Sequence, residues 1–289
     1  MGIVALAAAL AASSPAAAGA FTHEAFVGAR VNPLGESQEL AVGWRAPLLP
    51  DDGTLLRGES YVWLAPKVQL SPTFAGTGLQ LRVMPLAVVQ LQLHAERISA
   101  WSDPEGIDPD GVLPVTDATV AMIDLAGATI GSGWRTTNHL LLQGQSGPVA
   151  VRATTTLAGW RMDRGAAGAF YDQTWDILAP NHGWGVNLDV DVLAVTPEQR
   201  PVVGARYTAA TPLGAVDGWT GGATHRVGPV AGWTFRERRP GGWIQRPTLF
   251  ALAQWHLAHP WRTGSPTPRA LPQVGVGLSV VGDVPPPPN

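Results

Sequence analysis

The chain has 289 residues, a length that allows one or two domains. Hydrophobic residues make up 45% of it and the formal net charge is -3, a balance that argues against disorder and against the basic surface of a nucleic-acid-binding protein. The absence of cysteine excludes a disulfide scaffold and a thiolate metal site.

Residues 1–20 have the features of a secretory signal peptide, although they carry no Lys or Arg. An apolar run from Ile3 to Ala12 precedes small residues that end in Ala18-Gly19-Ala20, which resembles an A-x-A cleavage site. A buried N-terminal helix is the alternative. After residue 20 no stretch reaches 18 apolar residues, which excludes a helical membrane protein. We therefore expect an exported chain whose mature part begins at residue 21.

From there, apolar and polar residues alternate with a period of two, the pattern of strands with two different faces. The segment 79–95 contains Pro85-Leu86-Ala87, which predicts a tight turn between two strands. The segment 98–131 has Asp-Pro and Asp-Gly pairs and is expected to be the longest loop, with 116–126 as a short helix or an additional strand. The other candidate strands are 23–32, 37–46, 59–71, 134–144, 148–160, 167–178, 184–195, 201–210, 224–237, 247–257 and 272–282.

Three features favour a membrane barrel over a soluble sandwich. Charged residues account for only 14% of the chain, against about 25% in an average soluble domain. The apolar faces are nearly free of charge, as a lipid-facing surface requires. Tryptophan lies at predicted strand ends, where an aromatic girdle meets the membrane interfaces, at Trp44, Trp134, Trp160, Trp184 and Trp243.

The fold prediction is therefore all-β: a closed antiparallel up-and-down transmembrane β-barrel over residues 21–284, followed by a proline-rich tail at 285–289. Twelve strands are expected, because bacterial single-chain barrels have even strand numbers, and fourteen is the alternative. The hairpins of 55–72 and 79–95 resemble those of Gram-negative outer-membrane β-barrel proteins of uncharacterised type. That resemblance implies outer-membrane localisation, with membrane lipid, lipopolysaccharide and the barrel assembly machinery as partners. The chain departs from the resemblance at its end, where Gly282-Asp283-Val284 replaces a terminal aromatic residue.

The faces opposite the apolar ones define the expected lumen. Candidate lumen residues carry both signs of charge: Arg82, Arg152, Arg206, Arg226, Arg246, Asp172, Asp189 and Asp191. Such charges either pair into a network that fills the interior or form charged rings in a narrow pore. The expected function is a structural outer-membrane protein or a narrow passive channel for small solutes. The alternatives are a soluble exported β-domain that binds a ligand such as carbohydrate and, less favoured, a barrel enzyme acting on lipid.

The sequence does not predict a catalytic site, a cofactor or a metal. No G-x-S-x-G nucleophile motif or H-E-x-x-H zinc motif occurs. His256 and His259 are three residues apart on a predicted strand, so we expect them to point to opposite faces and not to share a metal ion. The basic cluster 236–239 lies before a Pro-Gly-Gly turn, where it contacts lipopolysaccharide or is simply solvated. No nucleic-acid partner is expected, and the oligomeric state is not predicted.

Overall fold

The computed structural model describes residues 19–31, 35–50, 60–100, 131–163, 169–172, 174–196, 201–214, 222–235, 244–245, 247–260, 263 and 271–284. Several predictions from the sequence lie outside these residues: the signal peptide, the segment 116–126, Arg246, Trp243, the cluster 236–239 and the proline-rich tail. Among the described residues there is no helix long and apolar enough to cross a membrane.

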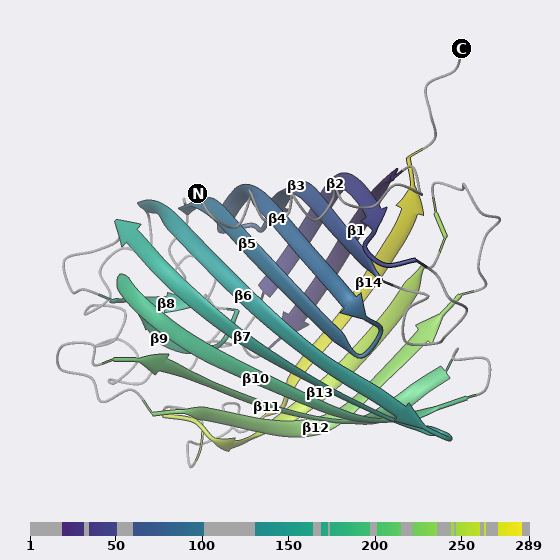
Figure 1. Ribbon diagram of the computed structural model, residues 1–289. Helices are drawn as coiled ribbons and strands as arrows, with labels where there is room; N and C mark the ends of the chain where they lie inside the picture. The colour runs from purple at the N-terminus through teal and green to yellow at the C-terminus, as the bar shows by residue number, and fades with distance from the viewer. Residues whose placement is uncertain are drawn as a thin grey trace.

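The described residues form β-strands from one end of the described chain to the other. Their bounds are β1 (Ala20–Val31), β2 (Gly35–Pro47), β3 (Tyr61–Leu70), β4 (Phe74–Leu86), β5 (Val89–Ala100), β6 (Gly131–Ser146), β7 (Val149–Asp163), β8 (Ala169–Asp172), β9 (Ile177–Pro180), β10 (His182–Val195), β11 (Pro201–Leu213), β12 (Thr224–Thr234), β13 (Thr248–Ala258) and β14 (Gln273–Asp283). All except β8 and β9 belong to one closed barrel of 12 strands (Figure 1).

Neighbouring wall strands are antiparallel and follow one another along the chain, except that β7 pairs directly with β10. β1 and β14 pair from Thr22↔Asp283 to Val31↔Val274, so the sheet closes and has no free edge. The predicted closed antiparallel barrel of 12 strands is confirmed.

Each wall strand has an apolar outer face and a more polar inner face, because successive side chains of a strand point to opposite sides. On β10 the outward Trp184 and Val192 are 46% and 51% exposed, whereas the inward Asn187 and Asp191 are 6% and 3% exposed. The charge-poor faces found in the sequence are therefore the outer surface of the barrel.

The two ends of the barrel differ in the length of their connections. At the termini end, where β1 begins and β14 finishes, residues 48–60 connect β2 to β3 and residues 235–247 connect β12 to β13, and two-residue turns at 87–88 and 147–148 join β4 to β5 and β6 to β7. The turn at 87–88 is the one predicted near Pro85-Leu86-Ala87. The longest connections are not at this end. At the opposite end, here called the long-loop end, residues 101–130 connect β5 to β6 and residues 164–181 connect β7 to β10.

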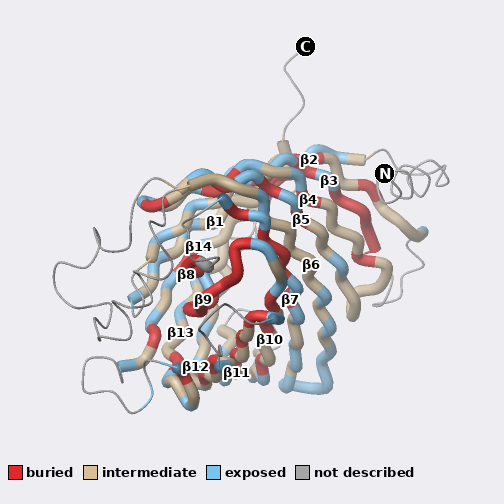
Figure 2. Tube along the Cα trace, turned by 90° about the vertical axis from the view of Figure 1, so that its left-hand side faces the viewer, coloured by how far each residue is buried: buried red, intermediate tan, exposed pale blue. Residues whose placement is uncertain are grey.

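The segment 167–178, predicted as a wall strand, instead contributes to a hairpin inside the barrel. β8 and β9 pair only with each other, from Ala169↔Pro180 to Asp172↔Ile177. Figure 2 looks into the long-loop end, where the buried β8 and β9 occupy the interior. β7 and β10 pair continuously from His182↔Arg161 to Ala194↔Val149, which leaves no wall edge for this segment.

The hairpin rests on an apolar area of the inner wall. Its Phe170, Trp175 and Ile177 form a buried cluster with wall residues that include Trp160 and Met162 of β7. The Trp160 ring meets Phe170 and Trp175 edge-on, with centroids 6.1 and 5.5 Å apart, a geometry that aromatic rings prefer. The hairpin is thus held in the lumen by burial of its own apolar side chains.

Trp160 therefore differs from its prediction as an interfacial residue. It is 2% exposed and lies on the inner face. Trp160 has the same parity along β7 as the lumen-facing Arg152, and an even spacing on a strand places two residues on one face. Its position at the end of a strand suggested the membrane interface. Whether a strand residue faces lipid or lumen depends instead on its even or odd position along the strand.

Candidate functional site: a charged lumen narrowed by a hairpin

The inner faces of the wall enclose a cavity of about 380 Å³. Its lining combines neutral polar groups with charges of both signs. The cations are Lys67, Arg135, Arg152, Arg206 and Arg226, and the acids are Glu39, Glu96, Asp172 and Asp189. The polar inner faces of strands from all around the barrel therefore meet in one space.

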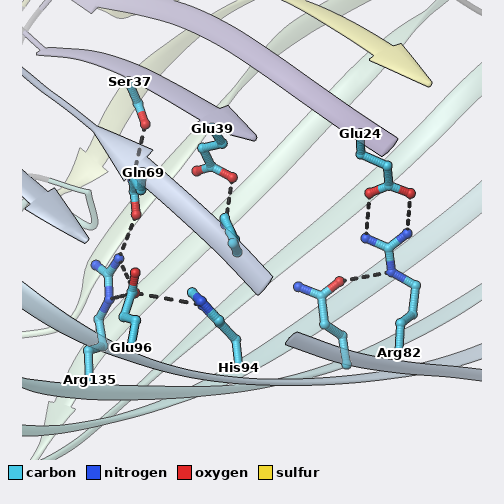
Figure 3. A network of polar contacts seen from close by, with 10 residues as sticks. Glu24, Ser37, Glu39, Gln69, Arg82, His94, Glu96 and Arg135 are labelled. Atoms are coloured by element: carbon cyan, nitrogen blue, oxygen red, sulfur yellow. Dashed lines mark hydrogen bonds and ion pairs between the residues drawn. The ribbon is translucent and has the colours of Figure 1, made fainter. Parts of the chain in front are cut away.

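One charge pair joins β1 to β4 over the inner faces of β2 and β3. The guanidinium of Arg82 donates from Nη1 and Nη2 to the two carboxylate oxygens of Glu24, at 2.5 and 2.8 Å (Figure 3). Its Nε donates to Gln92 at 3.1 Å, and its Cζ atom lies 4.7 Å from the centroid of the Trp63 ring. This two-point geometry fixes the guanidinium, since both hydrogen bonds are charge-assisted.

A second network lies on β5 and β6. Arg135 donates to the buried carboxylate of Glu96 at 2.6 Å and to the Gln69 side chain at 3.0 Å (Figure 3). Gln69 donates in turn to Ser37 at 3.0 Å. The pair Lys67–Glu39, 2.6 Å apart, comes from the neighbouring strands β3 and β2. Sequence reasoning missed Arg135, although its parity is opposite to that of the outward Trp134.

A third network lies on β10, β11 and β7. Arg206 donates to both oxygens of Asp191, at 2.6 and 2.9 Å. Arg152 approaches the same carboxylate only to 3.5 Å, and its side chain is 46% exposed. Asp189 accepts a hydrogen bond from the Thr208 hydroxyl at 2.6 Å. Arg152 is thus more loosely held than Arg206 and more open to the lumen.

The hairpin reaches from one side of the lumen towards the other. Arg30 of β1 donates to the backbone carbonyl of Thr174 at 2.9 Å, so the turn of the hairpin contacts the wall opposite β7. A further cavity of about 380 Å³ is lined by Arg30, Phe26 and Phe250, and Thr174 borders this cavity as well as the first. The hairpin therefore narrows the lumen between two open spaces.

An aspartate holds the turn of the hairpin in shape. The Asp172 carboxylate accepts hydrogen bonds from the backbone N–H groups of Thr174 and Trp175, at 2.8 and 3.1 Å. This is the local side-chain-to-backbone bonding that favours aspartate in turns. Asp172 thus lies inside the barrel, where it organises the hairpin as well as lining the cavity.

The predicted lumen residues are placed as follows. Arg246 lies outside the described residues. Asp172 lies in the hairpin, and the remaining candidates lie on inner faces of the wall, at Arg82 of β4, Arg152 of β7, Arg206 of β11, Arg226 of β12, and Asp189 and Asp191 of β10.

Of the predicted interfacial tryptophans, Trp134 and Trp184 are 53% and 46% exposed on the outer face. Trp44 lies opposite the exposed Phe21 in the register, which places it on the outer face as well. Trp243 lies outside the described residues. Trp134 and Trp184 are near the long-loop end and Trp44 is near the termini end, so outward aromatic residues occur at both ends of the barrel.

The structure does not place the side chains of His256 and His259 as the sequence predicted. The rings of His256 and His259 face each other edge-on with centroids 4.9 Å apart, and both lie near Asp176 of the hairpin. Regular alternation stops because β13 ends at Ala258 and Pro260 lacks a ladder donor. The expectation that the two side chains point to opposite faces is therefore wrong.

Comparisons with known proteins find distant similarity in structure only. No family model and no curated protein matches the chain. The KdgM porin shares 7% identity with it at a TM-score of 0.40, over 90% of this chain and 98% of that one. OccK11 (OpdR) of Pseudomonas aeruginosa shares 8% identity at a TM-score of 0.30, over 92% and 96%. The TodX monoaromatic hydrocarbon channel shares 9% identity at a TM-score of 0.30, over 93% of this chain and 90% of that one.

At such low scores the fold rests on the chain's own strand pairing. The pairing of β1 with β14 closes the wall, the exposed leucines, valines and tryptophans cover its outside, and ion pairs line its inside. The chain has the architecture of an outer-membrane β-barrel.

Proposed function

We propose that this protein is a narrow passive channel for small polar solutes in a bacterial outer membrane. The observation that carries the proposal is the polar cavity of about 380 Å³ inside a closed wall whose outer face is apolar. A barrel of 12 strands falls between packed eight-stranded barrels and open porins of about 16 strands. The hairpin β8–β9 then sets the width of the passage.

The outer face supports residence in lipid. A band of exposed leucine and valine side chains, for example Leu142, Val151 and Val192, surrounds the wall, with tryptophans near its ends. A soluble carbohydrate-binding domain would expose this whole band to water, which monomeric soluble proteins rarely do. We infer that the long-loop end faces the cell exterior, because outer-membrane barrels have short periplasmic turns and longer extracellular loops.

Passage of small ions of both signs, with a weak preference for anions, fits the lining. Most of its charges are neutralised by partners on the wall, such as Arg135 by Glu96 and Lys67 by Glu39. Arg152 contributes a loosely paired positive charge that faces the cavity. A ring of charge at a constriction biases which ions enter.

Reconstitution into planar lipid bilayers tests the proposal. We expect small, stepwise conductance from the purified protein, and larger steps from Trp175→Ala, which shortens a hairpin side chain packed against the wall. Trp184→Ala is the matched control, since it removes an outward tryptophan. A folded barrel that conducts nothing, with or without Trp175, would contradict the channel and favour a purely structural role.

We propose no catalytic step for this lumen. A barrel enzyme acting on lipid needs a nucleophile and a base near the lipid surface, and neither the sequence motifs nor the wall contacts described above supply such a pair. Purified protein in mixed micelles is expected to show no lipase or deacylase turnover. Measurable turnover would replace the channel proposal with the enzymatic one.

We also propose outer-membrane lipid, lipopolysaccharide and the barrel assembly machinery as partners. Near the long-loop end, Trp134, Arg161 and His182 lie side by side in the register of three strands. Trp134 is exposed on the outer face, so the positive Arg161 beside it is placed to meet a lipid phosphate. Arg161→Ala is expected to lower the lipopolysaccharide that copurifies with the barrel, with Arg152→Ala in the lumen as control.

A further inference from the structure

Three metal-ligating side chains from separate parts of the chain converge beside the hairpin. Asp176 lies in the hairpin turn, His256 lies on β13, and His259 follows the last residue of that strand. Their potential ligand atoms all lie within 4.8 Å of one another. His259 Nε2 is 2.9 Å from Asp176 Oδ2 and 3.1 Å from the Asp176 carbonyl oxygen.

The local backbone explains how Asp176 comes to face the histidines. Its N–H donates to the Asp172 carbonyl at 2.9 Å, which closes the turn of the hairpin. Asp176 has a φ of 58°, in the left-handed region that most side chains avoid and aspartate tolerates better than most. It is fully buried, so the turn presents its carboxylate to the wall and not to solvent.

We propose that Asp176, His256 and His259 bind a divalent transition-metal ion of the Zn²⁺ type. Imidazole nitrogen and carboxylate oxygen are ligands that Zn²⁺ prefers, and three protein ligands leave a fourth position for water. Bonds of roughly 2.0–2.2 Å hold tetrahedral ligand atoms about 3.4 Å apart. The His259–Asp176 contact of 2.9 Å is already that close, and small rotations of the side chains bring the third ligand to the ion.

The same geometry explains what the ion does to the fold. Two ligands belong to the end of β13 and its extension, and the third belongs to the hairpin, so the metal joins the hairpin to the wall. Arg30 makes a separate link to Thr174 of the hairpin from β1.

The first test is direct binding of Zn²⁺ to the tag-free, chelator-treated barrel in detergent, followed by calorimetry. We expect saturable binding of one ion per chain and no comparable binding of Mg²⁺, which prefers oxygen ligands. His256→Ala and Asp176→Asn should each weaken the affinity by at least about 10–100-fold, the loss that even outer partners of a metal site cause. His182→Ala at the long-loop end is the control and should bind as tightly as the parent protein.

Heat-modifiable migration in detergent shows whether each variant still forms a barrel, so that lost binding is separated from lost folding. His259→Ala removes the contact with Asp176 as well as a ligand, and His256→Ala keeps that contact. Absence of saturable Zn²⁺ binding to the folded parent protein overturns the site. Unchanged affinity in a folded variant that lacks both histidines overturns it as well, because the ion then binds elsewhere.

Discussion

The wall and the hairpin of this barrel follow opposite rules for apolar residues. Wall strands direct most of their leucine and valine outward and keep charged groups inside, as β10 does with Val192 and Asp191. The hairpin does the reverse: all four residues of β9 are buried, and its Trp175 and Ile177 pack against the inner wall. On β7 the inner apolar residues Trp160 and Met162 mark where the hairpin sits. Tyr61, Trp63 and Met84 belong to a second inner cluster that contains no hairpin residue.

The largest expected effect on stability comes from Trp160→Ala, which removes the wall side chain that packs against the hairpin. A buried tryptophan truncated to alanine costs about 3–5 kcal/mol through lost contacts and a cavity. Trp184→Ala removes an exposed tryptophan on the adjacent strand β10 and should cost clearly less. Equilibrium refolding into lipid vesicles measures both free energies of unfolding. Equal losses would show that the inner and outer tryptophans do not differ in role.

The next effect tests the outer face of the wall. Leu140 lies on β6 and is 39% exposed on the outside. Leu140→Arg places a charge in the hydrocarbon, which costs roughly 2–4 kcal/mol near the bilayer midplane. Thr154→Arg is the matched control, because Thr154 lines the lumen and lies directly opposite Asp189 in the register. If both variants refold with the same stability, the assignment of outer and inner faces is wrong.

A smaller difference in stability is expected between variants of Arg206 and Arg152, which both contact the carboxylate of Asp191. Arg206→Gln loses two hydrogen bonds to Asp191, and a hydrogen bond to a charged group contributes about 1.5–3 kcal/mol. Arg152→Gln loses a contact of 3.5 Å from a half-exposed side chain, which is worth about 0–1 kcal/mol. In bilayers we expect Arg152→Gln to shift ion preference towards cations. A reversal of the two stability losses would contradict the network described above.

The wall was predictable from the sequence and the hairpin was not. Period-two alternation identified the outer and inner faces, for example Val192 against Asp191, because lipid and lumen impose different chemistry on alternate residues. The same alternation assigned 167–178 to the wall, since a short apolar segment looks alike in either setting. The segment is excluded from the wall because β7 pairs directly with β10. The local sequence pattern does not encode this long-range pairing.

The lumen was predicted in part for a similar reason. Parity placed Arg82, Arg206 and Asp191 on inner faces, and Arg206 lies directly opposite Asp191 on the neighbouring strand. The partner of Arg82 is Glu24 of β1, three strands away in the wall, which local pattern does not indicate. Glu24 and Arg82 are separated by 58 positions in sequence. The approach of His256 and His259 to Asp176 depends on where β13 ends and on a hairpin from another part of the chain, so alternation gave the wrong answer there.

The last comparison concerns two residues with left-handed backbone angles, one in the wall and one in the hairpin. Gly147 in the β6–β7 turn has a φ of 57°, close to the 58° of Asp176 in the hairpin turn. A Cβ added at Gly147 would meet no atom within 4 Å, so space is not limiting and the backbone angle alone requires glycine. Gly147→Ala should cost about 1–2 kcal/mol, measured by refolding into vesicles, and Gly147→Asn less, since asparagine adopts this region more readily.

Asp176→Gly keeps the backbone angle but removes the carboxylate that contacts His259, so it should loosen the hairpin even though glycine suits the turn. A stabilised hairpin in Asp176→Gly, seen as slower amide hydrogen exchange over 169–180, would show that aspartate is present there for the turn and not for its contact with the wall.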